Sequence, residues 1–214
     1  MQIKNKKYSI IIFLLSFIYF ASNVYAEEFD ITAKEIIIDK ENQTLVATGS
    51  VQALDSDGKL IYADKITYKK LKEFLLAEGK VKIIDNEGNI LKTDKAIYDK
   101  LNGKITTYQN SKLILKEGYK LSGKNIQYNT NEKILESNEN SIFTDDEGNI
   151  IETNMFQYSI NDKLFSSLGK IKIIDINKNK YFFKEIHIDT KIKEMIGSDV
   201  SVILDQENFG VSKE

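Results

Sequence analysis

The sequence contains no cysteine, no proline and no tryptophan, and its single histidine is His187. Without cysteine there is no disulfide framework, no thiolate zinc site and no thiol nucleophile. A lone histidine also excludes a metal centre built from several imidazoles. We therefore expect a chain without metal or cofactor, and we do not expect an enzyme.

Positive charge is not in excess either, since 30 Lys and Arg residues stand against 32 Asp and Glu residues, for a net charge of −2. A protein that binds nucleic acid needs surplus cations to displace the counterions of the phosphates. Nucleic acid is therefore not an expected partner. The 214 residues are 42% hydrophobic, which suits one or two globular domains rather than a disordered chain.

The first 26 residues have the pattern of a signal peptide. Three lysines among the first seven residues precede an apolar run from Tyr8 to Phe20. That run is shorter than the roughly 20 residues that span a bilayer. The segment Val24–Ala26 fits a signal-peptidase site, so we expect cleavage before Glu27, with an uncleaved membrane anchor as the alternative. Export without cysteine is typical of a bacterial envelope protein, and we expect a periplasmic location.

A thirty-residue repeat runs through the remainder of the chain, six times and without insertion. One column holds mostly tyrosine: Ile38, Tyr68, Tyr98, Tyr128, Tyr158 and Ile188. Two further columns are apolar: Ile36, Ile66, Ala96, Ile126, Phe156 and Ile186, then Leu45, Leu75, Ile105, Leu135, Phe165 and Met195. Another column holds small residues: Ala47, Ala77, Thr107, Ser137, Ser167 and Gly197. So many coincident columns indicate a repeat architecture.

Within each repeat the apolar residues recur at every second position, which predicts strands rather than helices. The stretch Leu75–Ile83 alternates in this way, and a turn follows at Asp85–Gly88. An Asp that opens a type I turn and a Gly that closes it in the left-handed region make a short hairpin. Calcium loops are the alternative, but the glycine comes too early for an EF-hand loop.

The alternation changes parity partway along the other half of each repeat, near Asp64 and Asp94. A bulge there would bend the strand and turn its second half inward. Each repeat would then supply two strands of about ten residues. We predict an all-β fold over residues 27–205, an antiparallel meander folded into a β-jelly roll or open β-sandwich. Hairpin alternation excludes a parallel β-helix, and residues 206–214 would lead out of the domain.

The phrase Leu60–Tyr68, followed by Leu76–Val81, resembles the OstA-like repeats of the lipopolysaccharide transport machinery. The resemblance implies a periplasmic module that binds lipopolysaccharide and passes it toward the outer membrane. Its implied partners are other jelly-roll proteins of that machinery, joined by edge strands, and the outer membrane where a membrane domain follows. The tail 206–214 favours a domain of the family's outer-membrane assembly protein over its free-standing bridge protein. Gln109 and Glu139 replace repeat glycines, so the third and fourth repeats should bend differently.

The resemblance also implies that the inward columns line an apolar groove for acyl chains, each buried methylene contributing about 0.8 kcal/mol. Small residues in this lining would keep the groove unfilled. Alternatively, the same side chains close a dry core. The expected lining is Ile36, Ile38, Leu45, Ala47, Val51, Ile66, Tyr68, Leu75, Ala77, Val81, Ile83, Tyr98, Ile105, Ile126, Tyr128, Leu135, Phe143, Phe156, Tyr158, Phe165, Ile171 and Ile173.

An open meander leaves a first and a last strand that can pair with another chain. The first strand contains Ile36, Ile37 and Ile38, and we expect it to be the docking edge. His187 lies between two isoleucines and should be exposed and inert. Two rival hypotheses are a structural envelope repeat and a glycan hydrolase that uses Asp64 and Asp94.

Overall fold

The computed structural model describes residues 29–205, which form antiparallel β-strands and one turn of 3-10 helix, η1 (Lys70–Lys72). The long strands are β3 (Thr44–Asp55), β4 (Leu60–Lys69), β5 (Phe74–Ile84), β6 (Ile90–Asp99), β7 (Lys104–Ile114), β14 (Leu164–Ile174) and β15 (Lys180–Asp189). The short strands are β1 (Phe29–Thr32), β2 (Glu35–Asp39), β8 (Lys120–Lys124), β9 (Gln127–Asn129), β10 (Ile134–Ser137), β11 (Ser141–Thr144), β12 (Ile150–Thr153), β13 (Phe156–Ser159), β16 (Glu194–Ser198) and β17 (Ser201–Ile203). No helix in this part of the chain is long and apolar enough to cross a membrane.

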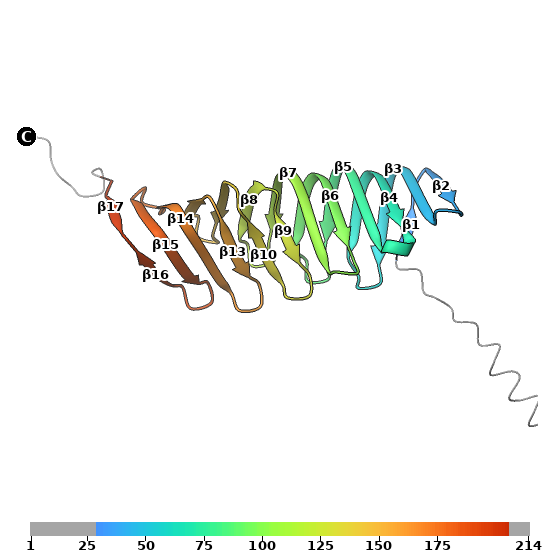
Figure 1. Ribbon diagram of the computed structural model, residues 1–214. Helices are drawn as coiled ribbons and strands as arrows, with labels where there is room; N and C mark the ends of the chain where they lie inside the picture. Colours follow the sequence, from blue (N-terminus) through green and yellow to red (C-terminus); the bar gives the residue numbers. More distant parts are fainter. Residues whose placement is uncertain (1–28, 206–214) are drawn as a thin grey trace, which may run out of the picture.

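Each long strand bends once, and its two halves pair in different layers. The first half of β3 pairs with β2 and its second half with β1. Layer 1 contains β2, β9, β10, β13, β16 and the long-strand halves between them. Layer 2 contains β1, β8, β11, β12, β17 and the opposite halves. Figure 1 shows the strands following one another along the long axis, from β1 and β2 to β16 and β17.

The bends lie where the parity of the sequence changes. In the β4–β5 pair the register shifts between Tyr62 and Lys65, a stretch that contains Asp64. In the β6–β7 pair it shifts at Asp94. The all-β antiparallel sandwich and its bulges are thus confirmed. The predicted ten-residue strands are confirmed for β3 to β7 and for β14 and β15, whereas residues 120–159 divide into six short strands, β8 to β13, and the strands at the two ends are also short.

The two residues that replace repeat glycines behave differently from each other. Gln109 adopts the left-handed conformation of its glycine equivalents, with a φ of 64° against 76° for Gly79, and β7 continues through it. The prediction of a different bend is therefore wrong for the third repeat. It is right for the fourth repeat, where the chain leaves β10 and resumes in β11 around Glu139.

Small side chains at the bends form hydrogen bonds with the backbone. Thr107 Oγ1 donates to the Ile126 carbonyl at 3.2 Å and accepts the Ile126 N–H at 3.0 Å. Ser167 Oγ donates to the Met155 carbonyl at 2.8 Å. The ladder is interrupted at a bend, and the Thr107 hydroxyl there gives the buried Ile126 N–H its acceptor, while the Ile126 carbonyl also accepts the Thr107 backbone N–H at 2.9 Å. The hydroxyl members of this column are buried, so the column also serves the hydrogen bonding of the bends.

The layers enclose a single apolar core that extends from Phe29 to Ile186. The predicted hairpin turns connect neighbouring strands at the margin of this core. In one of them the Gly88 N–H donates to the Asp85 carbonyl at 3.1 Å, and Asp85 Oδ1 accepts the N–H groups of Glu87 and Asn89. Gly88 has a φ of 95°, the left-handed conformation that the turn prediction required.

Replacement of Thr107 by Val should lower the free energy of unfolding by about 1–3 kcal/mol, because the buried Ile126 N–H loses its acceptor. The Ile126 carbonyl keeps its bond from the Thr107 backbone N–H, at 2.9 Å. Urea unfolding measures the change. The control is Thr106→Val, one residue away and on the opposite face, which should change stability by less than about 0.5 kcal/mol. Equal effects of the two substitutions would show that the Thr107 hydroxyl does not support the bend.

Candidate functional site

The predicted groove residues gather in one interior between the two layers. Nearly all are buried or half-buried, and they form the core described above. Ile36 and Ile38 are the exceptions, with exposures of 41% and 62%, because no strand follows β2 at that end of layer 1. Sequence reasoning missed part of the layer 2 lining, such as Ile61, Leu91 and Phe183. Their alternation was visible in the sequence. These residues face the interior because the bend turns both halves of each long strand inward.

This interior is packed along most of its length. Ile66 and Phe165 have no exposed surface, and Ile126 is 1% exposed. Cavities between the layers occur toward the ends. One of about 350 Å³ is lined by Phe29, Ile38 and Tyr68, among others. Another of about 250 Å³ is lined by Phe143, Ile188 and neighbouring residues. In this structure the interior is therefore packed over most of its length, with cavities toward its two ends.

Both ends carry free strand edges with apolar side chains. Among the strands of residues 29–205, β1 and β2 pair only with β3, and β16 and β17 pair only with β15. Ile37 is 60% exposed at the first end and Ile196 is 76% exposed at the last. Sequence reasoning favoured the first edge, yet the last edge is as apolar and as exposed.

Opposite the bends, the hairpin turns of the two layers meet along a line that we call the seam. Its layer 1 turns lie at residues 40–43, 70–73, 100–103, 130–133, 160–163 and 190–193, and its layer 2 turns at 55–58, 85–88, 115–118, 145–148 and 175–178. Successive turns of layer 1 are joined by backbone hydrogen bonds, such as Thr130 N–H to Gly103 at 2.7 Å and Ile160 N–H to Lys133 at 2.9 Å. Between the layers, only side chains cross the seam in the residues described.

A buried polar cluster closes the seam near the first end. Lys59 Nζ lies 3.2 Å from Asp55 and 3.1 Å from Asp57, and the Tyr98 hydroxyl donates to Asp55 at 3.2 Å. Burial raises the pKa of Tyr98 to about 12. Burial acts to lower the pKa of Lys59, but Tyr98 and the two aspartates outweigh it and raise that pKa. The cluster ties layer 2, through Asp55, to layer 1, through Tyr98.

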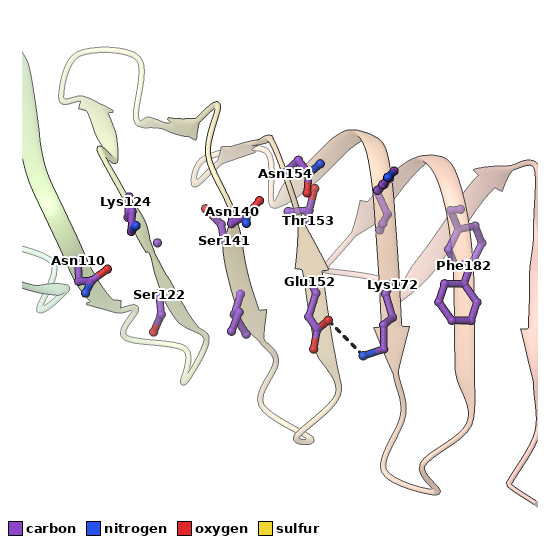
Figure 2. Close-up of a pocket in the computed structure, with 15 residues that line it drawn as sticks. Asn110, Ser122, Lys124, Asn140, Ser141, Glu152, Thr153, Asn154, Lys172 and Phe182 are labelled. Carbon is purple, nitrogen blue, oxygen red and sulfur yellow. Dashed lines mark hydrogen bonds and ion pairs between the residues drawn. The ribbon is translucent and has the colours of Figure 1, made fainter.

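A separate concavity lies on the outer face of layer 2. Figure 2 shows its larger part, of about 680 Å³, where Lys172 pairs with Glu152 at 3.1 Å across neighbouring strands. An adjoining part of about 590 Å³ is lined by Lys82, Lys92 and Lys112, among others. The lining combines charged, amide and hydroxyl groups with apolar side chains such as Ile142 and Phe182.

The remaining candidates for chemistry lie apart from one another. The His187 side chain is half exposed, as predicted, with Nδ1 3.0 Å from Ser166 Oγ and Nε2 3.0 Å from Glu185. Asp64 and Asp94 occupy separate bends and are exposed. Within residues 29–205, no group of three acidic, His or Cys side chains could hold a metal ion.

Replacement of Asp55 by Ala should lower the free energy of unfolding by about 3 kcal/mol, because it leaves Lys59 buried beside an unpaired hydroxyl. The matched control is Asp57→Ala, which removes a mostly exposed carboxylate from the same lysine and should cost less than about 1 kcal/mol. Chemical denaturation at neutral pH compares the two. Similar costs would mean that the buried contact does not hold the seam.

Comparison with solved structures gives weak matches. LptH from Pseudomonas aeruginosa, described as the LptA-homologous periplasmic component of the lipopolysaccharide transport device, is 10% identical. That match covers 84% of this chain and 99% of LptH, with a TM-score of 0.26. The G-box domain of the microcephaly protein CPAP is 9% identical over 77% of this chain and 97% of its own, with a TM-score of 0.19. Scores this low carry no functional argument.

A search of curated proteins found no significant match to the sequence. The model of the OstA-like protein family, in contrast, matches residues 23–154. This match spans more than half of the sequence and includes the phrase Leu60–Tyr68 that carried the resemblance. The chain belongs to the OstA-like protein family.

Proposed function

We propose that this chain is a periplasmic lipopolysaccharide-binding and transport module that shelters acyl chains between its two layers. The observation that carries the proposal is the apolar interior, continuous from Phe29 to Ile186 and accessible at both ends. Membership of the OstA-like family supports it and agrees with a non-enzymatic role. Each methylene removed from water contributes about 0.8 kcal/mol, so a lipid with several acyl chains needs such an interior to cross an aqueous compartment.

The chemistry of the lining suits movement as well as binding. Its polar members, such as Thr107 and Ser167, already bond the backbone and offer no strong contact to a passing chain. The rest are aliphatic or aromatic side chains that repeat every thirty residues. An acyl chain would meet a similar environment at each repeat, so it could advance without a single deep binding site.

Within this function we favour the periplasmic domain of an LptD-type outer-membrane assembly protein, exported by the signal peptide at residues 1–26. A free-standing LptA-type bridge protein is the alternative. The two segments behind these assignments, 1–26 and 206–214, lie outside the described residues. Other jelly-roll proteins of the machinery would add to the edge at β2, so that sheet and interior continue from one protein to the next.

A hydrolase is not favoured, because Asp64 and Asp94 lie exposed at separate bends, and Asp94 lines the outer concavity without Asp64. A structural repeat would use the same open edges but would need no lipid. Lipid capture therefore discriminates between the proposed module and a structural role.

A photoreactive phenylalanine analogue at Tyr158, which is 1% exposed and faces the interior, should crosslink to lipopolysaccharide in cells. The control position is Gln157, its neighbour on the outer face of β13, which should give no lipid adduct. Immunoblotting for lipopolysaccharide on the purified protein reads the result. Adducts at neither position, or at both positions equally, would count against the sheltered interior.

Replacement of Ile37 by Pro should weaken association with a jelly-roll partner domain. The Lys34 N–H donates to Gly49, so the amides of Ile36 and Ile38 face β3 and the amide of Ile37 faces the free edge. Size-exclusion chromatography with the partner measures the loss. The control Ile36→Pro removes a bond to β3 and should disturb β2 itself. Unchanged association of the Ile37→Pro variant would place the docking edge elsewhere.

A further inference from the structure

Three ion pairs cross the seam at regular intervals. Their lysines are thirty residues apart, and so are their glutamates, which precede them by 46 residues. The pairs are Lys133–Glu87 at 3.0 Å, Lys163–Glu117 at 2.6 Å, and Lys193–Glu147. Each joins a layer 1 turn to a layer 2 turn, so the row closes the part of the seam beyond the buried Asp55 cluster.

The last pair of the row borders a cavity of the interior. The cavity of about 250 Å³ has Lys193 and Glu147 at its polar side and Phe143, Ile151 and Ile188 at its apolar side. An amphiphile with its headgroup at the row would therefore have its acyl chains in the interior.

Within residues 29–205, the layer 1 turns share a left-handed residue at this position. Lys133, Lys163 and Lys193 have φ values of 59°, 59° and 58°, and Gln43, Glu73 and Gly103 of the earlier turns have φ values of 46°, 46° and 60°. The backbone therefore accepts several residue types here and does not itself select lysine. A lysine is present in three successive turns, and each one faces a glutamate of the other layer.

The glutamates are also replaceable partners. The hydrogen bond from Lys163 is the largest influence that lowers the pKa of Glu117, and both side chains are partly exposed. A phosphate group carries more negative charge than a carboxylate and offers more acceptor oxygens to an ammonium group. Phosphate on an incoming lipid can therefore compete for the lysines, and the freed glutamates would no longer hold the turns together.

We propose that Lys133, Lys163 and Lys193 form a binding row for the phosphate groups of a lipid that enters sideways through the seam. Glu87, Glu117 and Glu147 occupy this row while no lipid is bound. The proposal rests on the proposed function and adds to it both the entry route and the headgroup site.

The first test compares two triple variants, one with the three glutamates changed to Gln and one with the three lysines changed to Gln. The probes are lipid A with its phosphates intact and lipid A after dephosphorylation. Loss of the competing carboxylates should raise the affinity for phosphorylated lipid about tenfold, and loss of the lysines should lower it. Dephosphorylated lipid should bind both variants equally. The controls Glu152→Gln and Lys172→Gln neutralise a pair on the outer face and should change nothing.

Equal affinity of the two triple variants for phosphorylated lipid would overturn the headgroup site. The closing role of the row is read without lipid, from the rate at which maleimide modifies a cysteine introduced at the buried Leu135. Both triple variants should raise this rate, and unchanged rates would overturn the closing role. If the unmodified chain bound neither probe while these rates still rose, the proposed function would fail and the closing role would stand.

The second test holds the seam closed with a covalent bridge. The chain has no cysteine, so cysteines at Glu117 and Lys163 can be bridged selectively by a short bis-maleimide. The bridged chain should lose uptake of lipid A, whereas the same bridge between positions 152 and 172, within layer 2, should leave uptake intact. Normal uptake by the chain bridged at 117 and 163 would show that lipid enters through the ends and would overturn the sideways route.

Discussion

The fold depends on one constraint, which is that every long strand changes its inward face at a single bend. Without the register shift, the side chains of the two halves would point to opposite faces of one flat sheet. With the shift, both halves face inward, and one continuous meander becomes two layers around a shared interior. The hydroxyl groups of Thr107 and Ser167 lower the energetic cost of this arrangement in a buried core, because they form hydrogen bonds with backbone groups at the bends.

The two long sides of the sandwich consequently differ in strength. On one side the chain itself joins the layers at every bend, so separation there would break the strands. On the other side, within residues 29–205, only side-chain contacts join the turns of one layer to those of the other. The seam is also graded along its length, from the buried Tyr98–Asp55 contact at one end to exposed ion pairs such as Lys193–Glu147 at the other. Any opening of the interior is therefore easiest along the seam and toward the end that carries β16 and β17.

Most of the fold could be predicted from the sequence because its signals are local. Alternation, turn residues and the parity change near Asp64 each concern fewer than about twelve neighbouring residues, and the repeat presents them several times. The left-handed Gln109 was missed because backbone context, rather than residue type, decides that conformation.

The candidate site was less predictable because it depends on how the two layers meet. The inward columns were evident, but not whether they enclose an open groove or a packed core, since that depends on the distance between the layers. The pairing of Lys163 with Glu117 follows from the stagger of the two layers, which the sequence does not encode locally. The thirty-residue recurrence of both residue types was nevertheless present in the same self-alignment.

The account is tested most directly by pulsed electron paramagnetic resonance distances between spin labels, measured with and without bound lipid A. One pair, at Lys116 and Asn161, spans the seam and leaves the Lys163–Glu117 contact in place. A second pair, at Ser122 and Gln127, spans the bend between β8 and β9. The account predicts that lipid lengthens the first distance and leaves the second unchanged. An unchanged seam distance in the lipid-bound protein would contradict it.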